Sequence, residues 1–187
     1  MMWSMKTRWT LRWALVVGLF GWFLLGGAGA QGDDSMKIMS PAFAWGEHLP
    51  ARYALCGPGA RNLSPPLAWS GAPQETASFV LLVLDPDAPR GTFVHWVVYD
   101  LPAGVRKLDE GASGARWLRE GRNDYGKMGY GGPCPPRGSE HHYVFRLYAL
   151  ATPTLGLPAG ATAAQVEAAM APWVLAEAEG TVLYGRR

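Results

Sequence analysis

The sequence predicts a mostly β domain with one helical segment, arranged as an antiparallel sandwich. Three stretches rich in apolar, β-branched and aromatic residues have the length of strands, and turn-forming residues lie between them. Gly (24) and Pro (15) make up more than a fifth of the 187 residues, which favours short elements over long helices. Short strands separated by turn signals are typical of an antiparallel β-sandwich.

The three predicted strands cover residues 77–85, 92–100 and 141–150. The first, ASFVLLVLD, is a continuous apolar run that ends in an acid, as expected for a central strand buried on both faces. The second is TFVHWVVYD and the third is HHYVFRLYAL. The segment 129–140 is expected to be irregular, because its prolines lack a backbone donor and its glycines lack a side chain.

A helix is expected after Thr162, which forms a capping-box pattern with Gln165 ahead of an alanine-rich run. Pro172 should kink or split this helix near residue 171, and Gly180 is suited to end it. The stretch 181–185, TVLYG, is then expected to be a last strand, while residues 31–40 should form a short, loosely held lead-in.

The first 30 residues are predicted to be a secretory signal peptide, which leaves one β domain at residues 31–187. Residues 1–12 carry three bases and no acid, residues 13–25 are apolar or glycine, and residues 28–30 read Ala-Gly-Ala. The alternative is an uncleaved membrane anchor, but the apolar stretch is shorter than the roughly 20 residues of a spanning helix. We therefore expect export to the periplasm or the extracellular space, with no stable membrane span after cleavage.

Removal of this segment changes the charge balance of the protein. The full chain has 17 Lys and Arg against 15 Asp and Glu, and three of the bases but none of the acids precede residue 31. The mature chain therefore has 14 bases against 15 acids, a net charge of −1. No basic tail or patch is evident, so nucleic acid is not an expected partner.

The two cysteines, Cys56 and Cys134, both fall in segments rich in glycine and proline. In an oxidising compartment they can form a disulfide, which would stabilise the chain by roughly 4 kcal/mol through closure of a long loop. The alternative is two free thiols in separate loops, and the sequence leaves both open.

Two histidines lie on otherwise apolar or aromatic strand faces, because side chains alternate between faces along a strand. His141 shares its face with Tyr143. His95 is expected on the same face as Val97 and Tyr99. A single histidine of this kind is usually a core residue with satisfied hydrogen bonds, but two of them near strand ends indicate a site.

If the three strand ends converge, these side chains and Asp85 would line one pocket. His95, His141 and Tyr143 would offer N–H and O–H donors to a ligand. Asp85 would accept from an imidazole and fix its tautomer, and backbone amides of the segment 129–140 would add donors. Such a cluster suits a small oxyanion, namely phosphate, sulfate or a carboxylate.

Other chemistries fit the same residues less well. A metal site could use His95, His141 and Asp85, but the sequence has no H-x-H or H-E-x-x-H pattern. A serine hydrolase would need a G-x-S-x-G motif, which is absent, and no G-K-[ST] phosphate loop occurs. A nucleophile pair of Cys134 and His141 would be abolished by a disulfide at Cys134. No metal or cofactor is therefore expected.

Four stretches resemble the phosphatidylethanolamine-binding proteins, in particular the bacterial branch often labelled Raf kinase inhibitor-like. They are SPPLAWSGAP at 64–73, DPDAP followed by HW at 85–96, GRNDYGKMGYGGPCPPRG at 121–138 and HHYVFRLYAL at 141–150. The resemblance implies an antiparallel β-sandwich with Greek-key connections, and a small pocket for phosphate-like anions and the headgroup of phosphatidylethanolamine. The pocket residues that it implies are Asp85, His95, Pro135, Pro136, His141 and Tyr143.

Two departures from the family pattern concern loops. The loop LCGPGARN, residues 55–62, lacks the aspartate of the Cys-Asp-Gly sequence common in the family, and a loop contact is expected to be lost with it. The pair Pro172-Trp173 stands where the family often has Gly-His, which is expected to reshape one rim of the pocket.

Together these observations predict an exported, non-enzymatic binding protein for a phosphate-like anion or a phospholipid headgroup. The kinase inhibition suggested by the family label is not carried over, because an exported protein does not meet cytosolic kinases. One alternative is a hydrolase of phosphate or acyl esters with a histidine as general base. Another is an inhibitor or interaction module whose pocket grips a phosphorylated or C-terminal group of an envelope protein.

Overall fold

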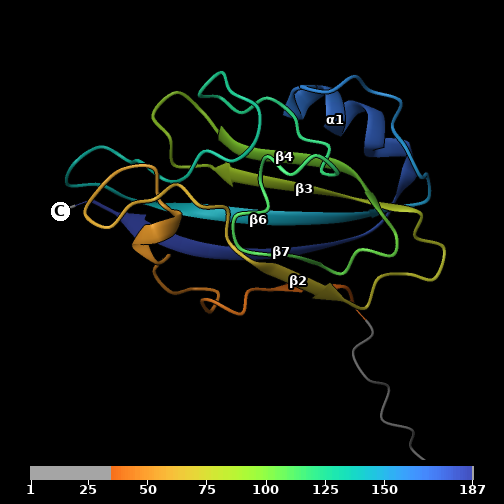
Figure 1. Ribbon diagram of the computed structural model, residues 1–187, viewed down its shortest axis with the longest axis horizontal. Helices are drawn as coiled ribbons and strands as arrows, with labels where there is room; N and C mark the ends of the chain where they lie inside the picture. The colour runs from red at the N-terminus through yellow and green to blue at the C-terminus, as the bar shows by residue number, and fades with distance from the viewer. Residues whose placement is uncertain (1–34, 187) are drawn as a thin grey trace, which may run out of the picture. The chain divides into compact units, whose positions relative to one another are not determined.

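The computed structural model describes residues 35–186, and the statements on structure below refer to this part of the chain. Two antiparallel sheets share a hydrophobic core there (Figure 1). The smaller sheet has the strand order β1–β2–β5, and the larger sheet has the order β4–β3–β6–β7. The predicted signal peptide, residues 1–30, lies outside the described residues.

The strands of the smaller sheet are short: β1 (Lys37–Met39), β2 (Leu67–Ser70) and β5 (Lys107–Leu108). The larger sheet contains β3 (Ser78–Asp85), β4 (Phe93–Pro102), β6 (Glu140–Leu150) and β7 (Val174–Gly185). The helical elements are α1 (Ala163–Met170) and the 3₁₀ turns η1 (Ala51–Tyr53) and η2 (Ala171–Trp173). After β4 the chain crosses to the smaller sheet as β5 and returns on the other side of β3 as β6, as in a Greek-key sandwich.

The central strand β3 is buried over its whole length, as its unbroken apolar run predicts. Alternate residues pack into two different cores. Phe79 and Leu81 face the core between the two sheets, whereas Val80 and Leu82 face the core beneath α1. Figure 1 shows α1 on the side of the larger sheet where β4 lies. β3 therefore holds both layers together, and its last residue, Asp85, is carried to the end of the sheet.

The predicted capping box is present at the start of α1. The backbone N–H of Gln165 donates to the Thr162 hydroxyl, and the Gln165 side chain accepts from the backbone N–H of Thr162. α1 ends at Met170, and the 3₁₀ turn that contains Pro172 follows at once. The helix thus breaks where the proline predicts, because proline lacks the donor that another helical turn needs.

The expectation that Gly180 ends the helix is wrong, because β7 begins at Val174 and Gly180 lies inside this strand. A Cβ atom at position 180 would lie 2.1 Å from an atom of the Trp45 ring. Glycine is required there because the indole packs directly on the strand. The expected loose lead-in at 31–40 is also wrong in part, since residues 37–39 form β1 and Met36 and Ile38 are buried.

The strand β4 carries an extra residue close to its start. Val94 and Trp96 pair with consecutive residues of β3, which leaves His95 between them without a partner. Such a β-bulge interrupts the alternation of side chains. Trp96 packs between the sheets, whereas Val97 and Tyr99 pack beneath α1. The expectation that His95 shares a face with Val97 and Tyr99 is therefore wrong, and the bulge turns His95 to the side of the inter-sheet core.

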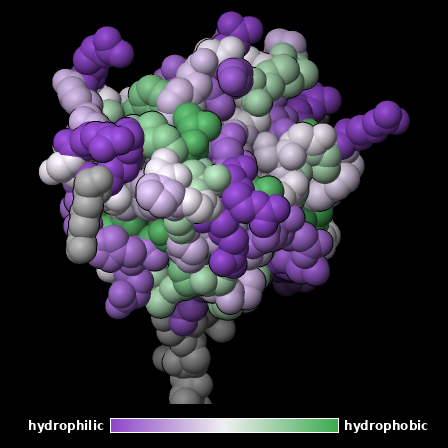
Figure 2. All heavy atoms as spheres, turned by 60° about the vertical axis from the view of Figure 1, so that its left-hand side comes forward, coloured by the Kyte–Doolittle hydropathy of each residue, from purple (hydrophilic) through white to green (hydrophobic). Residues whose placement is uncertain are grey.

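Within residues 35–186, no helix has both the length and the apolar character needed to cross a membrane. The surface that Figure 2 turns forward includes the end of the larger sheet where β3 ends. Hydrophilic residues there surround smaller hydrophobic areas. This is the end of the molecule that carries the candidate site.

Candidate functional site

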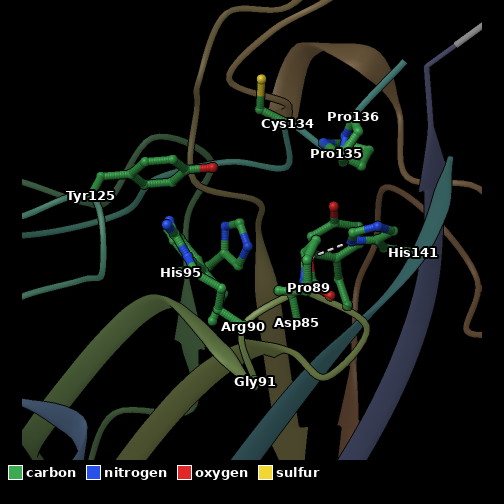
Figure 3. Close-up of a pocket in the computed structure, with 13 residues that line it drawn as sticks. Asp85, Pro89, Arg90, Gly91, His95, Tyr125, Cys134, Pro135, Pro136 and His141 are labelled. Atoms are coloured by element: carbon green, nitrogen blue, oxygen red, sulfur yellow. Dashed lines mark hydrogen bonds and ion pairs between the residues drawn. The ribbon is translucent and has the colours of Figure 1, made fainter. Parts of the chain in front are cut away.

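A pocket opens at the end of the larger sheet, where β3 ends and where β4 and β6 begin (Figure 3). Its cavity has a volume of about 190 Å³, which is enough for a small anion. The segments 88–91 and 134–136 contribute to its walls. All six residues expected at the site line this pocket: Asp85, His95, Pro135, Pro136, His141 and Tyr143. The three strand ends therefore meet.

Tyr143 lies between the two histidines of the pocket. The centroid of its ring is 5.1 Å from that of His95 and 6.5 Å from that of His141. Its side-chain hydroxyl is buried and makes no hydrogen bond with any residue that the structure describes. Burial, together with the negative charge of Asp85, raises the pKa of Tyr143. The proximity of the hydroxyl to the Asp85 carboxylate raises the pKa further, and the hydroxyl therefore stays protonated.

Asp85 orients His141 from the end of β3. The Nδ1 atom of His141 lies 2.8 Å from Oδ2 of Asp85, and because an ionised carboxylate only accepts, Nδ1 carries the hydrogen. The other carboxylate oxygen, Oδ1, accepts from the backbone N–H of Asp87 at 2.9 Å. Both side chains of the pair are buried, with Asp85 4% and His141 7% exposed. The expected role of Asp85 in fixing a tautomer is thus present, and Nε2 of His141 is left without a bond to a described residue.

His95 uses its N–H within the protein. Its Nδ1 atom lies 2.6 Å from the carbonyl oxygen of Gly131, and a carbonyl only accepts, so the hydrogen is on Nδ1. Burial lowers the pKa of His95 below its ordinary value, and the Gly131 carbonyl and the charge of Asp85 oppose this only in part. The ring is therefore neutral near pH 7. The expectation that His95 offers an N–H donor to a ligand is wrong, because the loop that contains Gly131 takes that hydrogen.

A second aspartate of the DPDAP motif fastens the pocket loop to β6. Asp87 Oδ2 accepts from the backbone N–H of His142 at 2.8 Å and pairs with Nδ1 of the same residue at 2.7 Å. These hydrogen bonds, the backbone one most of all, lower the pKa of Asp87. The loop 86–91 is therefore anchored at the mouth of the pocket.

This loop brings Arg90 to the pocket. Arg90 is the only lysine or arginine among the described residues that line it. Figure 3 shows its side chain extending along the wall that His95 and Tyr125 form. Sequence reasoning missed Arg90, because an arginine in an exposed turn between two strands carries no local mark of a site.

An aromatic wall was missed as well. Phe93 and Tyr125 line the pocket with their ring centroids 4.7 Å apart, and each ring also lies near that of His95. The Tyr125 hydroxyl donates to the Gly132 carbonyl at 3.0 Å. Phe93 could have been found from its spacing of two residues from His95 along the strand. Tyr125 lies in a long loop, where no periodicity indicates direction.

A disulfide fixes the pocket wall that contains Cys134, across from the aromatic wall. Cys56 and Cys134 are bonded to each other, and Cys134 itself lines the pocket. The loop LCGPGARN makes a further tie here, since Oδ1 of Asn62 accepts from the backbone N–H of Gly132 at 2.7 Å. A Cβ atom at Gly132 would lie 2.2 Å from the Tyr53 carbonyl oxygen, so only glycine permits this close approach. The wall is therefore held at several points before a ligand arrives.

The expected effect of Pro172-Trp173 on the pocket rim is wrong. Trp173 immediately precedes Val174, which pairs with Leu150, the last residue of β6. The pocket lies at the first residues of β6, at the opposite end of the sheet. Across residues 35–186, no group of three or more His, Cys, Asp or Glu side chains is placed to hold a metal ion.

Comparison with known proteins decides the family. The family model described as phosphatidylethanolamine-binding protein matches residues 39–185. The chain belongs to the phosphatidylethanolamine-binding protein family. The family membership expected from the sequence motifs is confirmed, and the match covers every strand of the larger sheet.

Relatives from distant organisms support this assignment. A UPF0098 protein of Aquifex aeolicus is 44% identical over 161 residues, which cover 84% of this chain and 92% of the relative. The UPF0098 protein YbhB of Escherichia coli is 42% identical over 139 residues, or 70% of this chain and 88% of the relative. Neither name states an activity.

Solved structures confirm the predicted fold. The crystal structure of YbcL from Escherichia coli, described as a new member of the mammalian PEBP family, matches with a TM-score of 0.76 at 34% identity. A phosphatidylethanolamine-binding protein homologue from Chlamydia trachomatis matches with a TM-score of 0.75 at 36% identity. Each match covers 82% of this chain and 99% of the other chain. The β-sandwich prediction is therefore confirmed.

Proposed function

We propose that the pocket binds a phosphate-like oxyanion, free or as part of a phospholipid headgroup, and that the protein is an exported binding protein. One observation carries this proposal: the Tyr143 hydroxyl is a buried donor with no partner among the described residues, in a residue only 1% exposed. Buried polar groups are nearly always hydrogen-bonded. An unpaired donor that lines a pocket therefore points to a ligand that accepts a hydrogen bond.

The charge and shape of the pocket support an anion. Arg90 supplies a permanent positive charge, and guanidinium groups bind phosphate oxygens well because they present several donors in one plane. Pro135 and Pro136 stiffen the wall opposite this cation. In a headgroup ligand, an ammonium group would find the carboxylate of Asp85 on the same floor.

Binding is favoured over hydrolysis by the state of the side chains that could attack a substrate. The sulfur of Cys134 is held in the disulfide, so it is not a nucleophile while the bond is intact. The raised pKa of Tyr143 keeps its hydroxyl protonated, which makes it a poor nucleophile. Export is supported by the composition of residues 1–30, and a disulfide is expected in an oxidising compartment.

Calorimetric titration of the protein, isolated from the envelope fraction with its disulfide intact, tests this function. We expect saturable heat with inorganic phosphate or phosphoethanolamine and shifted NMR signals of His95 and His141. The N-terminal residue of the isolated protein should be Gln31. Absence of both heat and shifts would count against the binding function. Hydrolysis of chromogenic phosphate or acyl esters that is lost in His95→Ala would favour the hydrolase instead.

A further inference from the structure

We propose that this pocket selects oxyanions that carry a hydrogen of their own, so that it binds phosphate and protonated phosphate monoesters in preference to sulfate. The inference rests on the proposed function, because it names the class of anion that the same pocket takes. It follows from the hydrogen-bonding capacity that the pocket residues retain after their bonds within the protein are counted.

His95 presents an acceptor to the pocket. A neutral imidazole has one N–H donor and one nitrogen with a free lone pair. The donor is Nδ1, which is bonded to the Gly131 carbonyl, so the lone pair is on Nε2. No described residue donates to Nε2. An anion oxygen without a hydrogen would place its own lone pair against this one, and the two would repel each other. An oxygen that carries a hydrogen can instead donate to Nε2.

Asp85 adds further acceptors on the floor of the pocket. Its Oδ2 atom accepts from His141, and its Oδ1 atom accepts from the backbone N–H of Asp87. Each carboxylate oxygen has two lone-pair directions, so acceptor capacity remains at both. The residue is only 4% exposed, so its negative charge is poorly screened by water. An anion oxygen without a hydrogen is therefore repelled on this side, whereas an O–H group can donate to the carboxylate.

Donors for the remaining oxygens come from other walls. The Tyr143 hydroxyl is unpaired, and Arg90 brings guanidinium N–H groups and a positive charge. The pocket thus combines donors with acceptors, which matches an anion that has both bare oxygens and an O–H group. Phosphate keeps at least one hydrogen near neutral pH, whereas sulfate keeps none. Sites built to pair with a ligand O–H discriminate strongly against analogues that lack it, because their own polar groups are then left unpaired.

Affinity measurements at pH 7.5 and constant ionic strength test this selection. We expect inorganic phosphate to bind at least about tenfold more tightly than sulfate, which corresponds to about 1.4 kcal/mol. In His95→Asn, the amide N–H can replace Nδ1 as the donor to Gly131, while Nε2 is removed. The ratio of phosphate to sulfate affinity should then fall below about threefold. His48→Asn is the matched control, because His48 is exposed, pairs with Glu140 and lies outside the pocket lining, so the ratio should stay unchanged.

A second measurement uses the unmodified protein and does not depend on the folding of a variant. Nitrogen NMR of the His95 ring should show a protonated Nδ1 and an unprotonated Nε2 in the free protein. Saturating phosphate should shift the Nε2 signal in the direction of a hydrogen-bonded acceptor, and sulfate should leave it unchanged. The charged groups that act on this ring are Asp85 and Asp124, and Arg90 lines the same pocket.

The outcomes separate this inference from the proposed function. If phosphate binds and sulfate binds within tenfold of it, or if His95 becomes protonated at both nitrogens when the anion binds, the inference is wrong and the anion-binding function stands. If neither phosphate nor phosphoethanolamine binds, both are wrong. Tighter binding of phosphoethanolamine, whose phosphate is mostly without a hydrogen at pH 7.5, than of inorganic phosphate would contradict the inference and point to a headgroup as the source of the bound group, whereas weaker binding would identify free phosphate.

Discussion

Two buried polar clusters of this molecule differ in how completely their hydrogen bonds are satisfied. Glu120, which is 6% exposed, accepts from the Trp96 indole at 2.6 Å, from the Ser113 hydroxyl at 2.6 Å and from the Gly114 backbone N–H at 2.8 Å. The pocket cluster instead leaves the Tyr143 hydroxyl unpaired. Burial of a charged or polar group therefore does not by itself mark a site. An unpaired donor does not mark a site by itself either, because the Trp69 indole N–H in the core between the sheets is also unpaired. The pocket cluster differs from both in placing its unpaired hydroxyl in a residue that lines a cavity.

The largest expected effect lies in the satisfied cluster. Glu120→Ala leaves three donors without an acceptor inside the protein, and we expect it to lower the free energy of unfolding by about 3–5 kcal/mol. Phosphate affinity of the folded fraction should stay within about twofold of the unmodified protein. Chemical denaturation and calorimetry measure the two quantities. Glu177→Ala on the exposed edge of β7 serves as control, and a Glu120 variant as stable as this control would contradict the comparison.

The tyrosines of the two clusters sharpen the comparison. Tyr143→Phe removes an unpaired hydroxyl, so we expect unchanged or slightly higher stability, together with about a tenfold loss of phosphate affinity. Tyr130→Phe is the opposite case, because the buried Tyr130 hydroxyl donates to the Tyr53 carbonyl at 2.9 Å. It should lose about 1 kcal/mol of stability and keep its affinity. Equal effects of the two substitutions in both measurements would show that the clusters do not differ as described.

The smallest expected effect is a dependence of stability on pH at His95. Its pKa in the folded protein lies below the ordinary value of 6.5, because burial disfavours the charged ring. Above pH 6.5 the residue is neutral in both states. As the pH falls below 6.5, the unfolded chain takes up a proton that the folded chain does not, so the free energy of unfolding decreases, by at most about 1.4 kcal/mol per pH unit for one group.

Denaturation of the unmodified protein and of His95→Asn at pH 7.5 and 5.5 measures this contribution. The unmodified protein should lose more stability between the two pH values than the variant does. The contributions of other titrating groups cancel in the difference between the two proteins, provided that their surroundings are unchanged. An equal loss in both proteins would mean that the His95 ring is not held neutral by burial.

Much of the fold could be predicted because its determinants are local. The apolar run of β3 and the capping box at Thr162 each depend on residues close together in sequence, and both are present as expected. The six pocket residues could be named because they lie at strand ends or in motifs of the family. These residues come together because the end of β3 and the starts of β4 and β6 lie at the same end of the larger sheet.

The remaining features depend on partners distant in sequence. The bulge at His95 is a property of the pairing between β4 and β3, and neither strand shows it alone. Gly180 looks like a helix end until Trp45 is known to pack on it. Arg90 and Tyr125 reach the pocket from loops whose course is set by tertiary contacts, such as the anchor between Asp87 and His142.

The extra residue in β4 breaks the alternation of side chains between the two faces of the strand. The residues ahead of the bulge therefore need not follow the alternation of the residues after it. Residues 96–99 lie between this bulge and a second irregularity of the strand, and their side chains alternate between the two cores. New binding preferences could therefore be engineered, or could arise in evolution, by exchange of the pocket residues Phe93 and His95 without a change in the alternation of residues 96–99. Deletion of one residue at the bulge would instead move the side chains of one part of the strand to the opposite face of the sheet.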